Sequence, residues 1–170
     1  RSIDLIAEKE RTEQQIRFGL LVSQIDPHFI CNTINSINYL ARKNRCEDVV
    51  TVDTALMAIL RDRLRVNDIE ITDTVAKEIA VVEQYLKIQR FMYGGDLRVV
   101  WDIEPELSEE QIPKNMIQPL VENALFHGLI DQESGMLDGE LRIALQRTAG
   151  GLLLTVRDNG VGIVPEQLEE

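Results

Sequence analysis

The spacing of apolar residues differs between the two ends of this chain, and that difference constrains the fold more than any other feature. From Ile3 to about Lys43 the only glycine is Gly19, the only proline is Pro27, and apolar residues recur at intervals of three and four. This is the period of an amphipathic helix. In several stretches after Leu97 apolar and polar residues alternate, which is the period of a strand with one buried face. We therefore expect a helical first part and a mixed second part.

The first part predicts a helical hairpin. Asn44 to Cys46 is expected to form the turn, and an apolar stripe from Val49 to Leu64 marks a second helix antiparallel to the first. Two helices with broad apolar faces cannot bury them alone. A homodimer in which two hairpins form a four-helix bundle about a twofold axis would bury both faces. We assign residues 1–67 to this dimerisation domain.

Residues 68–170 predict a two-layer α/β sandwich, so the fold class of the whole chain is α+β. We expect a short strand at residues 69–71, an N-cap within residues 72–74, and a helix that ends near Gly94-Gly95. The remaining expected elements are a strand over residues 97–103, a helix that carries Asn123 with Pro119 in its first turn, and two alternating strands at residues 141–145 and 152–156.

Composition excludes several function classes. The formal net charge of −11 argues against binding to nucleic acid or to an anionic membrane surface. Cys31 and Cys46 are too few for a disulfide framework or a zinc site and indicate reduced cytosolic thiols. The chain has no run of about 18 apolar residues and no signal-peptide pattern. We therefore expect membrane attachment only through segments absent from this chain.

Two motifs in the second part indicate a nucleotide site. Asn123 and His127 are four apart and share one face of a helix, where a carboxamide oxygen can bind a hard cation such as magnesium. Asp158-Asn159-Gly160-Val161-Gly162 follows an alternating strand as a loop, in which glycine lets the backbone approach a flat ligand. The Asp158 carboxylate can accept a hydrogen bond from the exocyclic amine of a base. Taken alone, the Asn123 segment also suits a surface helix that ends at a glycine. The Asp158 segment alone also suits a tight turn.

His28 is the candidate nucleophile of the first part. Gln24, His28, Asn32 and Asn35 fall in one polar stripe of the expected helix, so the imidazole faces outward. Pro27 inside a helix would cost about 3 kcal/mol, and such a cost suggests a function, namely a bend that aims His28 out of the bundle. A neutral imidazole is a competent nucleophile.

These motifs together resemble a known family. Residues Gln24 to Ile37, with the core Asp26-Pro27-His28-Phe29, resemble the phosphoacceptor motif of LytS/YesM-type sensor histidine kinases. Tyr85 to Phe91 looks like the next signature of that family, Gln118 to Gly128 resembles its N box, and Asp158 to Gly162 its first glycine box. The resemblance runs from about Leu20 to the end of the chain.

The resemblance implies the cytoplasmic part of a dimeric, bacterial membrane kinase with a GHKL-type ATP-binding domain. His28 would accept the γ-phosphoryl group of ATP and pass it to an aspartate on the receiver domain of a response regulator. The implied roles in the nucleotide site are Asn123 as the magnesium ligand, His127 and Glu122 along the phosphate side, and Asp158, Gly160 and Gly162 around the adenine.

Two departures from the family pattern affect the mechanism. Asp26 stands where the family usually has Asn, and Phe29 stands where many other histidine kinases have an acid, so the catalytic base is open between Asp26 and Glu122. The second glycine box, which covers the phosphates, would lie beyond Glu170. We therefore expect the nucleotide domain over residues 68–170 to be incomplete, and the chain alone to bind ATP weakly and not to label itself.

Two other functions fit the same residues. A degenerate kinase would be a non-catalytic dimeric signalling scaffold whose nucleotide site is vestigial. A GHKL ATPase of the anti-sigma or chaperone type would use the nucleotide site while His28 had no role. The Pro27-His28-Phe29 motif on a bundle helix argues against the second alternative.

Overall fold

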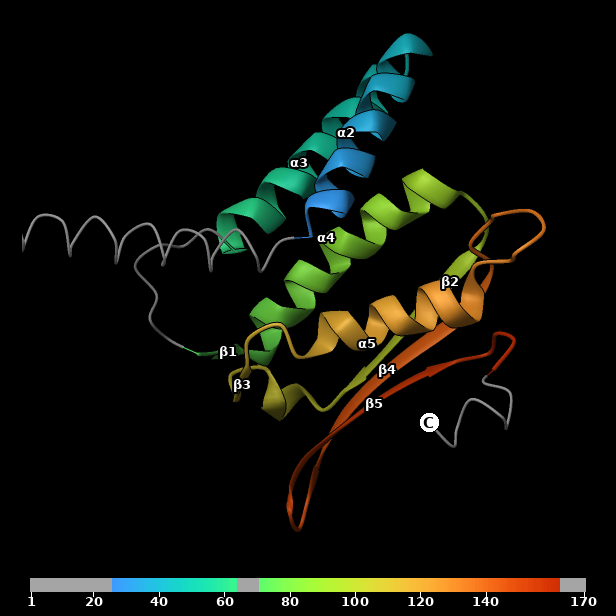
Figure 1. The fold of residues 1–170 in the computed structure, drawn as a ribbon. Helices are drawn as coiled ribbons and strands as arrows, with labels where there is room; N and C mark the ends of the chain where they lie inside the picture. Colours follow the sequence, from blue (N-terminus) through green and yellow to red (C-terminus); the bar gives the residue numbers. More distant parts are fainter. Residues whose placement is uncertain (1–25, 64–70, 163–170) are drawn as a thin grey trace, which may run out of the picture. The chain divides into compact units, whose positions relative to one another are not determined.

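The computed structural model describes residues 26–63 and 71–162. The chain divides into two compact units, residues 1–69 and 70–170, and each is described by itself. Within the described residues no helix is both long and apolar enough to cross a membrane. The fold is α+β, as the sequence predicts, with a helical unit followed by a unit of helices and sheets (Figure 1).

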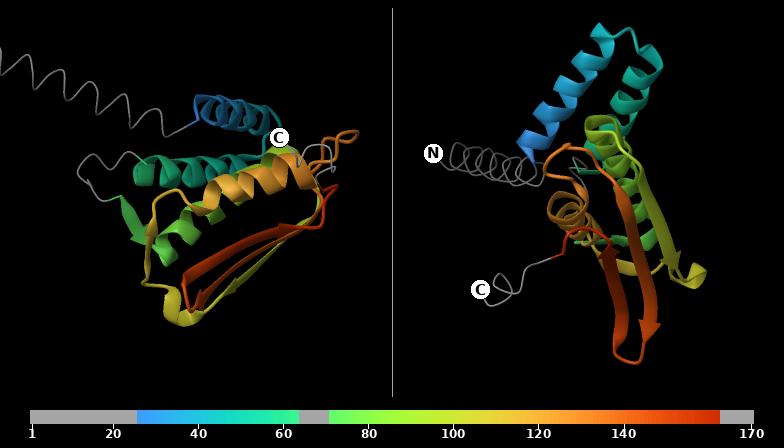
Figure 2. Two further views of the ribbon diagram at one scale, coloured as in Figure 1. Left: turned by 60° about the horizontal axis from the view of Figure 1, so that its bottom comes forward. Right: turned by 90° about the vertical axis from the view of Figure 1, so that its right-hand side faces the viewer.

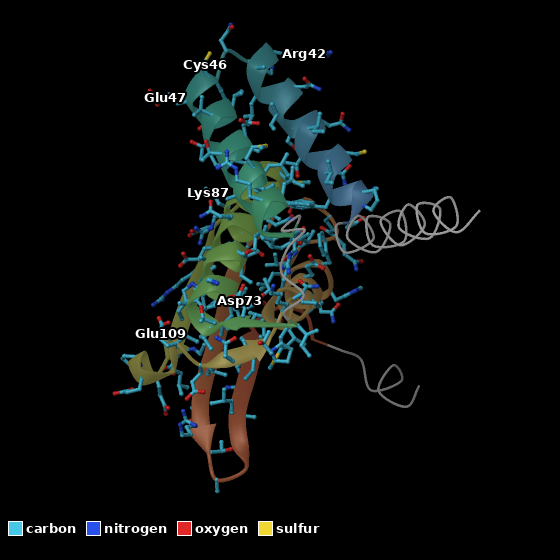
Figure 3. The ribbon with its side chains drawn as sticks, turned by 90° about the vertical axis from the view of Figure 1, so that its left-hand side faces the viewer. Arg42, Cys46, Glu47, Asp73, Lys87 and Glu109 are labelled. Atoms are coloured by element: carbon cyan, nitrogen blue, oxygen red, sulfur yellow. The ribbon has the colours of Figure 1, made fainter. Side chains whose placement is uncertain are left out.

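The first unit is a helical hairpin made of α2 (Pro27–Arg42) and α3 (Cys46–Arg63). The predicted turn is present, because Asn44 takes a left-handed φ of 55° and the backbone N–H groups of residues 43–45 bond to carbonyls in the last turn of α2. Figure 3 shows Arg42 and Cys46 at the same end of the hairpin, where this turn joins the two helices. The buried apolar side chains of these helices include Leu40, Val52 and Leu56.

The predicted position of Pro27 inside a long helix is wrong. Asp26 has an extended ψ of 111° and Pro27 is the first residue of α2. A proline ring disfavours helical backbone at the residue before it, and at the first helical position its missing N–H removes no hydrogen bond. Pro27 therefore starts the helix without the interior cost that we expected. The expected helix before it, residues 3–25, lies outside the described residues.

Within residues 71–162 the second unit has nine elements, with helices over a three-stranded sheet. In chain order they are β1 (Thr72–Thr74), α4 (Val75–Tyr93), β2 (Leu97–Ile103), a 3-10 turn η1 (Pro105–Leu107), β3 (Gln111–Pro113), α5 (Ile117–Asn123), a π-helical turn η2 (Ala124–Leu129), β4 (Gly139–Thr148) and β5 (Gly151–Asp158). The main sheet has the order β2-β4-β5, with β2 parallel to β4 and β4 antiparallel to β5. The views of Figures 1 and 2 place α4 and α5 on the same face of this sheet.

Sheet register explains which side chains form the core beneath the helices. Trp101 pairs with Ile143, which pairs with Val156, so one residue of each strand points to the same face. Ile143 and its neighbours of the same parity on β4, Leu141 and Leu145, are fully buried. The alternation predicted for these strands is therefore confirmed, with the central strand contributing the most buried residues.

Two details of the second unit differ from the prediction. The short strand β1 is described at Thr72–Thr74, where Asp73 pairs with Ile112 and Thr74 also caps α4 by accepting from the backbone N–H of Lys77. Of the predicted strand residues 69–71, residue 71 is not part of β1, and residues 69 and 70 lie outside the described residues. The helix after Pro119 does not stay α-helical, because it passes into η2 after Asn123. The end of α4 is as predicted, with Gly94 at a left-handed φ of 64°.

Candidate functional site

His28 lies in the first turn of α2 with an exposed side chain. Its backbone N–H donates to Asp26 Oδ1 at 2.9 Å, and its ring atom Nδ1 lies 3.1 Å from Nδ2 of Asn32. The Asn32 backbone carbonyl accepts from Ser36 Oγ at 3.0 Å, so this stretch of helix carries a short side-chain network. The outward position predicted for His28 is confirmed, and its ring is held on the Nδ1 side.

Asp26 is the N-cap of α2. A carboxylate at this position accepts from one of the free N–H groups of the first turn and interacts favourably with the positive end of the helix dipole. The hydrogen bond from His28 reaches this carboxylate from its backbone nitrogen and not from its ring. Asp26 therefore has a structural role that the sequence prediction did not include, and its role as a base stays a prediction.

The residues predicted to line the phosphate side lie on α5 and η2. The side chains of Asn123 and His127 are exposed, while Glu122 is half-buried. Glu122 Oε1 accepts a hydrogen bond from Gln118 Nε2 at 2.9 Å, one helical turn before it. Asn123 ends α5, and the next residue begins the π-helical turn.

The π-helical turn is the feature of this helix that the sequence did not indicate. Its backbone bonds span five residues, as in the bond of 2.9 Å from Ile130 N to Leu125 O. Such turns add one residue to a helical cycle and are frequent at functional sites. The turn follows directly after Asn123 and contains His127 and Gly128. It therefore decides how the end of the helix meets the sheet.

Asp158, at the end of β5, lies on the helix-covered face of the sheet. Asp158 pairs with the fully buried Leu141, and residues that are directly opposite in a ladder point to the same face. Its Oδ1 accepts a hydrogen bond from the backbone N–H of Gly160 at 3.0 Å. Its other oxygen, Oδ2, accepts no hydrogen bond from the residues that the structure describes.

Gly128 and Gly160 bring η2 and the loop after β5 into contact. A Cβ on Gly128 would lie 2.5 Å from Asp158 Oδ1, and a Cβ on Gly160 would overlap the carbonyl oxygen of Gly128. The same carbonyl accepts from the backbone N–H of Val161 at 3.2 Å. Sequence reasoning treated Gly128 as a helix stop and missed this role. The small residue next to His127 was the only signal for it.

The loop after β5 is also fixed to β4. Asn159 Oδ1 accepts from the backbone N–H of Glu140 at 2.7 Å, and the Asn159 N–H donates to the Glu140 carbonyl at 3.2 Å. Gly162 has a left-handed φ of 71°, which few other residues adopt without strain. The loop is thus held at both Asn159 and Val161, while its glycines leave backbone exposed.

The donors around Asn123 suit magnesium only in part. Among residues 26–63 and 71–162 no three His, Cys, Asp or Glu side chains gather as a metal cage. Magnesium often keeps several waters and binds through one or two protein oxygens together with nucleotide phosphates. The exposed Asn123 carboxamide fits that coordination pattern.

Known proteins similar to this chain are sensor histidine kinases. Residues 16–97 match the family model described as histidine kinase. The sensor histidine kinase YesM of Bacillus subtilis is 33% identical over 162 residues, which are 95% of this chain and 27% of that protein. Sensor histidine kinase YpdA of Escherichia coli is 34% identical over 155 residues, 88% of this chain and 25% of YpdA. Sensor protein kinase HptS of Staphylococcus aureus is 34% identical over 167 residues, 98% of this chain and 31% of HptS.

The chain thus spans between a quarter and a third of the length of these relatives. The match to the family model includes His28 and the Tyr85 to Phe91 signature, and the pairwise similarities continue over nearly the whole chain. The resemblance drawn from the motifs is confirmed: residues 16–97 belong to the histidine kinase family, and nearly the whole chain is similar to sensor histidine kinases.

Proposed function

We propose that this chain is the phosphotransfer and nucleotide-binding part of a two-component sensor histidine kinase. His28 accepts the γ-phosphoryl group of ATP and passes it to an aspartate on the receiver domain of a response regulator, on the cytoplasmic side of the membrane. The observation that carries the proposal is an exposed histidine, at a capped helix start, in a chain that also has an exposed Asn123 and a half-buried Asp158 in its second unit.

The first unit supports the role of His28 as nucleophile. Phosphoryl transfer needs an attacking atom in line with the leaving group and needs little covalent chemistry from the protein. The His28 side chain is exposed, so a nucleotide can approach its ring, while the Asp26 cap and Asn32 hold its backbone and Nδ1. These contacts restrict the motion of the imidazole, which favours the attack.

The second unit supports adenine and phosphate binding. Asp158 Oδ2 is suited to accept from the exocyclic amine of adenine, and the bare backbone at Gly160 and Gly162 suits a flat ring. On the same proposal, Asn123 holds magnesium, which neutralises phosphate charge during transfer. His127, exposed four residues further on, lies along the phosphate side with Glu122.

The exposed apolar residues of the hairpin support a homodimer. Ile34, Tyr39, Val50 and Met57 are between 40% and 64% exposed, which is unusual for large apolar side chains on a two-helix unit. A second hairpin packed about a twofold axis would cover them. We therefore propose a four-helix bundle as the dimer.

Glu122 and Asp26 are the two candidates for the base. We propose that Glu122 polarises the imidazole or orients water on magnesium, since Asp26 is engaged by the backbone of His28. In the full-length kinase Glu122→Gln should lower the autophosphorylation rate with little loss of ATP binding. An undiminished rate would exclude this role, and the matched variant Glu83→Gln, at an exposed position of α4, should leave the rate unchanged.

The decisive experiment is phosphate labelling of the full-length protein with [γ-³²P]ATP and magnesium. A kinase gives an acid-labile, alkali-stable label that disappears in His28→Ala and when EDTA removes the magnesium. A signalling scaffold gives no label. A GHKL ATPase hydrolyses ATP equally well in wild type and His28→Ala and leaves no phosphate on histidine.

A further inference from the structure

Within the described part of the chain, the hydrogen-bond partner of the His28 ring is the side chain of Asn32. Its Nδ2 lies 3.1 Å from Nδ1, four residues along the same helix. This spacing places two side chains on one face, with one above the other. The contact therefore follows from the helix itself, provided that α2 is intact in this turn.

The orientation of the contact determines which ring nitrogen carries a proton. An amide NH₂ only donates, so with Nδ2 toward the ring the Nδ1 lone pair accepts and the neutral imidazole carries its proton on Nε2. Such a ring has no free lone pair in its plane on either nitrogen. A half-turn of the amide about its Cβ–Cγ bond puts Oδ1 in the same place, where it accepts from Nδ1–H and leaves the Nε2 lone pair free.

The surroundings favour this local exchange. Because Nδ1 is the ring atom in contact with Asn32, Nε2 lies on the other side of the ring, and the His28 side chain is exposed. The Asn32 carbonyl is tied to Ser36 and the His28 N–H to Asp26, so both backbones are held while the amide can rotate. An amide, unlike a carboxylate or an ammonium group, can serve Nδ1 in both protonation states.

We propose that Asn32 is a positioning residue that selects Nε2 as the reacting nitrogen of His28. This proposal rests on the proposed function of His28. With Oδ1 on Nδ1–H, the Nε2 lone pair attacks the γ-phosphorus, the Nε2–P bond forms, and the bond from phosphorus to the bridging oxygen breaks with its electron pair going to ADP. The proton stays on Nδ1 beside Oδ1, and when it leaves to water the NH₂ side of the amide can donate to the freed lone pair.

The test compares Asn32→Ala and Asn32→Asp in the full-length protein. Asp keeps an acceptor for Nδ1–H, so it should retain phosphorylation at Nε2, whereas Ala should lower kcat about tenfold with KM for ATP unchanged. Ala should also produce a share of the Nδ1 isomer, read by ³¹P NMR or isomer-specific antibodies. Asn38→Ala, an exposed asparagine of the same helix, is the matched control.

A second arm uses potassium phosphoramidate, which phosphorylates imidazoles without ATP. If Asn32 selects the nitrogen, wild type gives mainly the Nε2 isomer at short times and Asn32→Ala gives both. Equal isomer ratios in wild type and Asn32→Ala in both arms would overturn the proposal. If ATP gives no label in wild type while the phosphoramidate arm still shows the Asn32 effect, the proposed kinase function fails and the positioning role stands.

Discussion

The two units hold their candidate residues in different ways. Around His28 every hydrogen bond spans two or four residues along one helix, from Asp26 to Asn32. Around Asp158 the contacts join distant segments, with Gly128 thirty residues before it and Glu140 bonded to Asn159 across nineteen. A site made of local contacts depends on helix formation alone. A site made of distant contacts depends on sheet register and on the helix end, so substitutions there should have larger effects.

The largest effect is expected for Gly160→Ala. An added Cβ has no room beside the Gly128 carbonyl, so η2 and the loop must separate. Forced overpacking typically costs about 1–3 kcal/mol, and we expect that loss of stability together with loss of ATP binding. Urea unfolding and calorimetry with ATP, both on the full-length protein, would measure the loss of stability and the loss of binding. Gly150→Ala, at a glycine with nothing within 4 Å, is the control, and equal behaviour of the two variants would contradict the contact.

Asp158→Asn should weaken nucleotide binding with a smaller effect on folding. The amide can still accept from Gly160 N–H but loses the charge that would strengthen a hydrogen bond from adenine. Hydrogen bonds to charged groups contribute about 1.5–3 kcal/mol, so ATP affinity should fall by about ten- to a hundredfold. Calorimetry of the full-length protein with ATP and with inosine triphosphate, which lacks the exocyclic amine, would check this. The role of Asp158 is refuted if wild type binds both nucleotides equally.

In the second unit Asp73 makes contacts with residues close to it in the chain. The contribution of its carboxylate to stability can be tested by changing the pH. Burial raises the pKa of the Asp73 carboxyl, but the hydrogen bonds from Lys77 and from Thr74 N–H outweigh it, so the pKa lies below the usual 3.8. The ionised form therefore stabilises the fold, in full above the usual pKa, and this stability is lost as the pH falls through the lower folded value. Figure 3 shows Asp73 near the β1 end of this unit.

Asp73→Asn should thus lower the free energy of unfolding at neutral pH and change it by almost nothing in acid below the folded pKa. Urea unfolding at both pH values would measure the difference. Asp102→Asn, at an exposed position of β2, serves as the reference variant. A loss that is independent of pH would mean that packing, and not ionisation, carries the contribution of Asp73.

The smallest effect is expected for Asp26 in the local site. Asp26→Ala removes the N-cap of α2 and should cost about 1 kcal/mol, while Asp26→Asn, which also caps helices, should cost only a few tenths. If Asp26 is only a cap, Asp26→Asn keeps the labelling rate of wild type. A large drop in that rate with unchanged thermal stability would instead identify Asp26 as the base.

The fold was predictable where a pattern is local. Period-two strands and the glycine end of α4 follow from side-chain spacing and backbone freedom at Gly94. The start of α2 was misjudged because Pro27 was treated as an interior residue, although the backbone before a proline is rarely helical. The parallel pairing of β2 with β4 joins strands thirty-five or more residues apart and leaves no local trace.

The site was predictable as a set of residue types and not as a set of contacts. His28, Asn123 and Asp158 stand out by chemistry and spacing. The closeness of Gly128 to Asp158 occurs at the π-helical turn Ala124–Leu129, and no residue spacing in the sequence indicates that turn. The four-residue step predicted that His28 and Asn32 share one face of the helix, but the hydrogen bond between them was visible only in the structure.

The π-helical turn also determines which sequence changes this segment can tolerate. Removing one residue between Asn123 and Gly128 would change the backbone hydrogen bonds of this turn from a five-residue to a four-residue spacing. The residues after the deletion would then rotate about the helix axis by about 100°, which is one α-helical step. Gly128 would then no longer face the loop after β5, even with every other side chain unchanged. In η2 the number of residues is therefore a stricter requirement than most of their identities, and an insertion or deletion there does more harm than a substitution.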